Sequence, residues 1–139
     1  MVRQTQRLKR RLDWPERLAE FIARCRGRKF DADYYCALFA ADAILAMTEN
    51  DPAAAVRGMD VEAAAAWLRG QGYETLLDYL RHEFHEVPLA MAGRGDVILR
   101  DLDGREALGI CLGVESAFLS SAGGLALWPT LDQQAAFRV

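Results

Sequence analysis

Apolar residues recur at helical spacing through the first half of the chain. The segment 36–47 carries a single charged residue, Asp42, and a helix that is apolar nearly all round is typical of the centre of a domain. Shorter apolar patterns over about 61–69 and 74–84 predict two more helices. A first amphipathic helix is predicted from one apolar stripe, formed by Leu18, Phe21, Ile22 and Cys25.

Residues with capping and helix-breaking chemistry predict where these helices begin and end. Asp13 is the expected N-cap of the first helix, with Pro15 in its first turn. Asp60 is the expected N-cap of the third. The Asn-Asp-Pro at 50–52 predicts the end of the central helix, and Pro88 the end of the helical half.

Beyond Pro88 the apolar period becomes that of β-strands. Asp103-Gly104 is a hairpin turn pair between the first two predicted strands. The four predicted strands cover residues 95–100, 105–112, 117–121 and 124–128. A helical half followed by a small antiparallel sheet predicts an α+β fold. We expect a single domain over residues 13–139, preceded by a basic arm at 1–12.

Length and composition narrow the class of protein. A chain of 139 residues suits one domain, and 52% hydrophobic with 27% charged residues excludes disorder throughout. The apolar runs are too interrupted for a membrane span. Three cysteines at wide spacing predict free thiols in a reducing compartment, with neither a disulfide framework nor a zinc site.

Charge is distributed unevenly along the chain. Residues 1–29 have a net charge of +7, whereas the remaining residues have −10. A sequence pI of about 5.4 argues against a nucleic-acid partner, so an anionic protein surface is the expected partner of the basic end. The candidate docking residues in the arm are Arg3, Arg7, Lys9, Arg10 and Arg11.

Cys36 is the first candidate for chemistry, because it begins the apolar central helix. A helix N-terminus stabilises a thiolate, which is the nucleophilic form of cysteine. The alternative is that Cys36 is a small buried apolar side chain, as free cysteines commonly are. Asp42 lies about 240° from Cys36 around the helix, so it is not the partner of this thiol; it either faces solvent or is buried and paired.

Several segments resemble a known family. They are Tyr35 to Ala43, Asn50-Asp51-Pro52, Arg57-Gly58, Gly95 to Leu99 and Ala107 to Gly113. Together they resemble a phage and prophage family of unknown function that is itself similar to the NlpC-type cell-wall peptidases, a compact branch of the papain-like fold. Its genes lie among the tail-tip genes of long-tailed phages. The resemblance covers about residues 13–139.

The resemblance implies a papain-like core with Cys36 at the position of the nucleophile. The catalytic histidine would open the strand that begins here at Ala107, and alanine accepts no proton. The third polar residue would fall at Ser120 if the turn is shifted by one residue. Tyr35 stands where the peptidases commonly have Asp. Because a cysteine nucleophile needs a base within hydrogen-bond reach, the implied site is degenerate.

The two histidines of the chain, His82 and His85, fall in the predicted fourth helix. With Glu83 and Glu86 they match neither zincin spacing, and no third ligand is evident. The sequence therefore predicts no metal and no cofactor.

The leading hypothesis is a non-catalytic structural or assembly component of a phage tail tip or baseplate. It would dock on neighbouring tail-tip or hub proteins, reside in the virion tail, and occupy the host cytoplasm during assembly. One alternative is an active cysteine peptidase or amidase that cleaves peptidoglycan stem peptides, with His82 or His85 as base. Another is an assembly factor that leaves before the particle is complete.

Overall fold

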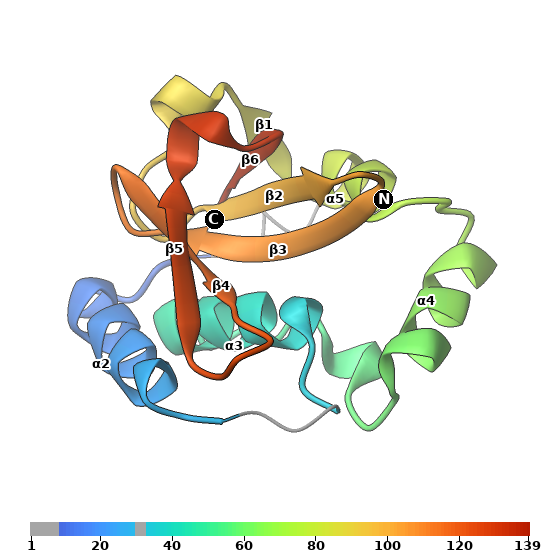
Figure 1. The fold of residues 1–139 in the computed structure, drawn as a ribbon, viewed down its shortest axis with the longest axis horizontal. Helices are drawn as coiled ribbons and strands as arrows, with labels where there is room; N and C mark the ends of the chain where they lie inside the picture. The colour runs from blue at the N-terminus through green and yellow to red at the C-terminus, as the bar shows by residue number, and fades with distance from the viewer. Residues whose placement is uncertain (1–8, 30–32) are drawn as a thin grey trace.

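The computed structural model describes residues 9–29 and 33–139 (Figure 1). Helices precede the sheet along this part of the chain, so the predicted α+β class is confirmed. The four α-helices of the described residues are α2 (Trp14–Arg26), α3 (Cys36–Thr48), α4 (Val61–Gly70) and α5 (Leu76–Glu83). The six strands are β1 (His85–Val87), β2 (Val97–Leu102), β3 (Arg105–Cys111), β4 (Glu115–Leu119), β5 (Leu125–Pro129) and β6 (Ala135–Arg138).

The strands form one sheet in the order β1-β6-β2-β3-β4-β5, and every neighbouring pair is antiparallel. Asp103 and Gly104 join β2 to β3 with φ of 54° and 84°, the left-handed conformations that a tight hairpin turn needs. The predicted hairpin is thus confirmed. Strands β1 and β6 were not predicted, because three or four residues are too few to show a period and their pairing joins distant parts of the chain.

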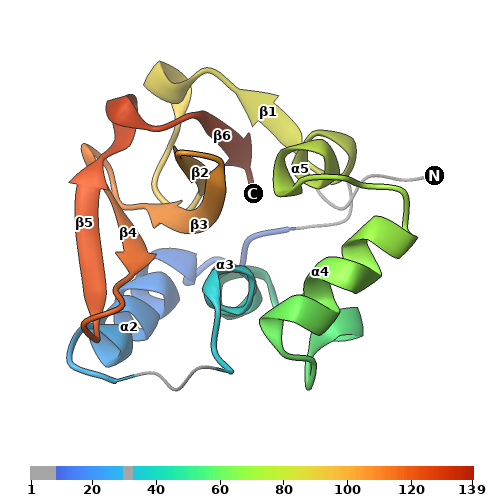
Figure 2. The same ribbon diagram turned by 45° about the vertical axis from the view of Figure 1, so that its right-hand side comes forward.

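The main core lies between one face of the sheet and helices α2 and α3, which pack side by side under β3 and β4 (Figures 1 and 2). Successive side chains of a strand point to opposite faces, so Val97 and Leu99 enter this core while Ile98 joins a second cluster on the other face. The second cluster consists of Val87, Ile98, Cys111, Phe118 and Ala136. The sheet therefore buries apolar residues on both faces.

The two predicted N-caps have different outcomes. The Asp60 carboxylate accepts a hydrogen bond from the Ala63 amide at 2.7 Å, which confirms it as the cap of α4. Asp13 is the N-cap residue of α2 and Pro15 lies in the first turn, as predicted, but the Asp13 side chain makes no capping hydrogen bond. Its carboxylate instead accepts from Arg17 Nε at 2.9 Å and Arg11 Nε at 3.3 Å. The Asp13 backbone, with ψ of 23°, is also outside the extended conformation that N-cap residues typically adopt.

The fourth helix is shorter than predicted. It begins after Thr75, whose hydroxyl accepts from the Asp78 amide, and it ends before Phe84. The chain is extended at Phe84, and His85 then pairs with Arg138 in the sheet. The prediction that His85 is helical was therefore wrong, because pairing with β6 satisfies its backbone instead.

No helix in the described ranges combines the length and the apolar character that crossing a membrane would require.

Candidate functional site

Cys36 is the first residue of α3 and follows Tyr35, whose backbone is extended. Burial raises the pKa of the Cys36 thiol above its ordinary value, and the negative charge of Glu106 raises it further. Hydrogen bonds from the backbone amides of Leu108 and Ala37 lower the pKa of this thiol, but the net pKa remains raised. The thiol form is therefore dominant at neutral pH, although the residue sits where a helix dipole favours thiolate.

Cys36 lines a cavity of about 210 Å³ that is partly open to solvent and is bordered by α3, α4, α5 and β3. Most of the lining is aliphatic or aromatic. The residues with polar side-chain atoms are Tyr35, Cys36, Trp67, Tyr79 and Glu106. Burial is the main reason that the pKa of Tyr79 is raised, to about 12, so its hydroxyl remains protonated.

Strand β3 presents alternate residues to this cavity. Glu106 and Leu108 line it, whereas Ala107 packs with the second cluster on the opposite face of the sheet. Position 107, where the resemblance implies a catalytic base, therefore points away from Cys36 in this structure. The β3 residues that face the thiol are a carboxylate and an aliphatic side chain.

Glu106 also binds the first turn of α5, next to the Thr75 cap. Its carboxylate accepts the Leu76 amide at 2.9 Å and the Leu77 amide at 3.1 Å. These are unpaired N–H groups of the first helical turn, where a negative charge is favoured by the helix dipole. Glu106 was not singled out from the sequence. Its alternation with Leu108 and Ile110 was the available indication that it faces the helices.

Neither histidine lines the Cys36 cavity. His82 Nδ1 is 2.8 Å from the Tyr73 hydroxyl and 3.4 Å from Glu83 Oε1, and its side chain is half exposed. His85 lies exposed at the edge of the sheet. Within residues 9–29 and 33–139, no cluster of three or more histidine, cysteine and carboxylate side chains could hold a metal ion.

Ser120 lies in the turn between β4 and β5. Its Oγ accepts a hydrogen bond from the Ala122 amide at 3.2 Å, and its own amide donates to the Gly124 carbonyl. The residue is not part of the lining around Cys36. The structure thus leaves both Ser120 and Ala107 out of the lining around Cys36, although the resemblance places all three residues together.

Tyr35 and the segment after α3 form one wall of the cavity. The Tyr35 hydroxyl donates to the Met59 carbonyl at 3.1 Å. Arg57 binds Asp51 at 2.8 Å and Asp42 at 2.6 Å, and this pairing lowers the pKa of Asp51. Asp42 is therefore partly buried and paired with Arg57, rather than facing solvent without a partner. These bonds hold the connecting segment against α3.

The candidate docking residues of the basic arm divide into three groups. Arg3 and Arg7 lie outside the described residues. Lys9 is exposed. Arg10 donates to Asp96 Oδ1 at 3.1 Å, to the Val139 carbonyl at 3.0 Å and to the Arg94 carbonyl at 2.9 Å, and its guanidinium stacks 4.2 Å over the Trp14 ring.

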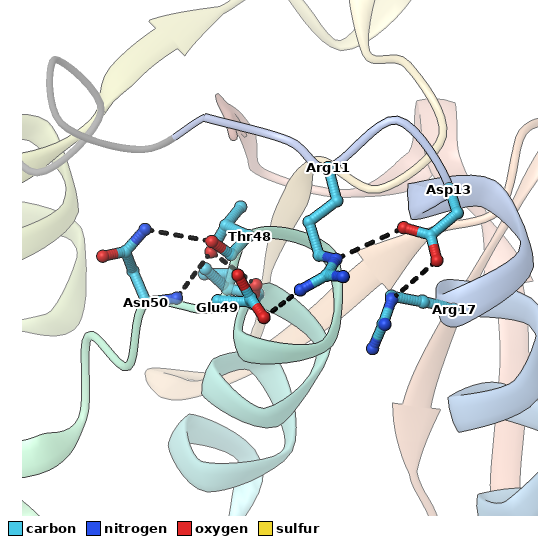
Figure 3. A network of polar contacts seen from close by, with 7 residues as sticks. Arg11, Asp13, Arg17, Thr48, Glu49 and Asn50 are labelled. Atoms are coloured by element: carbon cyan, nitrogen blue, oxygen red, sulfur yellow. Dashed lines mark hydrogen bonds and ion pairs between the residues drawn. The ribbon is translucent and has the colours of Figure 1, made fainter.

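Arg11 is likewise used within the domain. Its guanidinium bridges Asp13 at the start of α2 and Glu49 at the end of α3, and its amide donates to the Met47 carbonyl at 2.8 Å (Figure 3). Residues 10 and 11 therefore attach this segment to the body of the domain. Nothing in the local sequence distinguishes them from the other basic residues of the arm.

A comparison with curated proteins finds no match. A family model does match, over residues 9–139, and it includes α3, the connecting segment and the complete sheet. Its description states no activity. The chain is a member of the family called Domain of unknown function (DUF6950).

Proposed function

We propose that this chain is a non-catalytic structural or assembly component of a phage, or phage-derived, tail tip or baseplate, built on a degenerate papain-like core. The surroundings of Cys36 are the main observation against a catalytic role. A thiol with a raised pKa faces Glu106 and Leu108, and no imidazole lines its cavity. A cysteine nucleophile requires the opposite arrangement, a lowered pKa and an adjacent base.

Two features support the papain-like part of the proposal. A cysteine opens a buried helix, and that helix packs against an antiparallel sheet that follows it in sequence. The phage part rests on the sequence resemblance alone. An active cysteine peptidase acting on peptidoglycan stem peptides is the second candidate, favoured by the place of Cys36 at a helix N-terminus beside a cavity.

Alkylation of Cys36 across pH separates the two candidates. Iodoacetamide modification, followed by mass spectrometry of the Cys36 peptide, is expected to accelerate only above the pH at which an ordinary thiol ionises, because burial disfavours the thiolate. Free glutathione in the same reaction serves as the ordinary thiol, and the buried Cys25 and Cys111 report any unfolding. A midpoint on the acid side of an ordinary thiol would contradict the proposal, as would hydrolysis of purified cell wall that disappears in Cys36→Ala.

The assembly role is tested on particles. We expect the protein in purified virions by mass spectrometry, and we expect the charge reversals Arg3→Glu, Arg7→Glu and Lys9→Glu together to reduce its incorporation several-fold, because opposite charges orient protein docking. Arg24→Glu, Arg26→Glu and Lys29→Glu together, at exposed positions on and just after α2, make the same change in net charge and serve as the matched control. Unchanged incorporation of the arm variant would contradict docking through the arm. A protein needed for assembly but absent from mature virions would favour the transient assembly factor.

A further inference from the structure

The cavity at Cys36 has the size and lining of a site for one compact apolar group. Alanine, leucine, valine, tryptophan and tyrosine side chains make up most of its wall, and its volume is about 210 Å³. An apolar protein cavity of about 150 Å³ is large enough to bind benzene. A single aromatic ring or a branched aliphatic chain would therefore fill the cavity.

The Glu106 carboxylate on β3 gives the otherwise apolar cavity a hydrogen-bond acceptor on one side. The Glu106 carboxylate has about four lone-pair positions, of which the Leu76 and Leu77 amides use two. The remaining positions can accept from a donor on a ligand. The neutral thiol of Cys36 adds no opposing charge, so the negative charge of Glu106 disfavours an anionic group and favours a hydrogen-bond donor or a cation.

Helix α4 forms the outer wall, and its packing shows why a ligand would be stabilising. None of its ten residues is buried, although Val61, Ala65 and Leu68 line the cavity, and Val61 is 53% exposed. Figure 2 shows α4 on the outside of the fold, beside α3 and α5, where Ala64 and Trp67 pack against the cluster that contains Leu38 and Ala41. Covering this face with a ligand gains about 25 cal/mol per Å² of apolar surface removed from water.

Hydrogen bonds and ion pairs fix the segment between α3 and α4, which borders the cavity, without any ligand. Tyr35 binds the Met59 carbonyl just before α4, and Arg57 bridges Asp42 and Asp51. Asp60 then caps α4. A preformed wall of this kind reduces the ordering cost of binding.

From these observations we propose that the Cys36 cavity binds a ring-sized or branched apolar group that carries a hydrogen-bond donor or a positive charge, with the donor on Glu106 and the apolar part against α4. The group comes from a free small molecule or from a side chain of a partner protein. This site is independent of the assembly role, since neither the arm nor catalysis takes part in it.

The test uses three probes of nearly equal shape: benzylamine, benzyl alcohol and benzoate. Titration of the full chain, followed by amide NMR, is expected to shift resonances of α4, α5 and β3 with the first two probes. Binding should also slow alkylation of Cys36. Benzoate should bind at least about fivefold more weakly, which corresponds to about 1 kcal/mol of charge repulsion at a partly exposed site.

Three variants make the test specific. Glu106→Gln should remove the discrimination against benzoate and keep benzyl alcohol binding. Ala65→Leu narrows the cavity and should abolish binding of all three probes, whereas Ala66→Leu, an exposed neighbour on the same helix that does not line the cavity, should leave binding unchanged. Absence of binding, equal affinity for benzoate, or equal behaviour of the two leucine variants would overturn the proposal.

A second arm of the experiment identifies the source of the group. A blocked tetrapeptide with phenylalanine beside lysine presents the same chemistry on a polypeptide. Tighter binding of the peptide than of benzylamine assigns the cavity to a protein partner. Tighter binding of benzylamine assigns it to a free small molecule.

Discussion

Arg10→Ala is expected to lower the free energy of unfolding by about 3 kcal/mol, because it removes one partner of a buried ion pair. Asp96 is 1% exposed, and its carboxylate also accepts the Gly93 amide at 2.9 Å and the Val139 amide at 3.1 Å. The single guanidinium of Arg10 thereby joins the start of the described chain, the segment before β2 and the C-terminal end of the sheet. Without it, a buried carboxylate loses its counter-charge.

Arg11→Ala is the matched control, one residue further along. Its ion-pair partners are Asp13, 52% exposed at the side chain, and Glu49, 69% exposed (Figure 3). Exposed pairs contribute roughly 0–1 kcal/mol, so this variant should remain close to the parent in urea unfolding. An equal decrease in the free energy of unfolding in Arg10→Ala and Arg11→Ala would contradict the expectation that the buried ion pair contributes more than the exposed ones. Charge reversals that test docking should leave Arg10 intact, since loss of its ion pair with Asp96 is expected to destabilise the domain.

Glu106→His is expected to activate Cys36, whereas Ala107→His is not. The first change removes the carboxylate that raises the pKa of the thiol and places an imidazole on the side of β3 that faces the cavity. A protonated imidazole favours thiolate, and each unit by which the thiol pKa falls raises the thiolate fraction near neutral pH about tenfold. The second change puts the imidazole on the opposite face of the sheet.

The measurement is the rate of Cys36 alkylation near neutral pH in both histidine variants. Circular dichroism checks that each variant is folded, because Glu106→His also removes the two hydrogen bonds at the start of α5. Faster alkylation in Ala107→His than in Glu106→His would show that residue 107 reaches the thiol. That result would restore the papain-like placement of the base and contradict the β3 register described here.

Patterns of neighbouring residues were sufficient to predict that the helices and the central strands exist. The apolar stripe of α2, the nearly uncharged α3 and the Asp103-Gly104 turn each depend on residues close in sequence, so they were predictable. Asp60 and Asp13 show the limit of this approach. Both residues stand at the predicted N-cap positions, yet only the Asp60 side chain makes a capping hydrogen bond, whereas the Asp13 carboxylate binds Arg11 and Arg17.

The candidate site was predictable only in part. The place of Cys36 at the start of α3 followed from the change between a polar loop and an apolar helix. Its surroundings did not follow, because Glu106 and the two α5 amides that it binds come from other elements. The assignment of a base position to 107 relied on resemblance, whereas the alternation of β3 places Glu106 and Leu108 toward the thiol.

By itself, the sequence determined the α+β class, the α3 helix with Cys36 at its first residue, and the β2–β3 hairpin, because each depends on periodicity or turn chemistry over a few neighbouring residues. The tertiary structure decided the insertion of β6 between β1 and β2, the use of Arg10 as an internal partner of Asp96, and the apolar cavity that Cys36 shares with Glu106. The physical reason is the range of the interactions. Strand pairing, buried ion pairs and cavity walls join residues far apart in the chain, and their geometry exists only after the chain has folded.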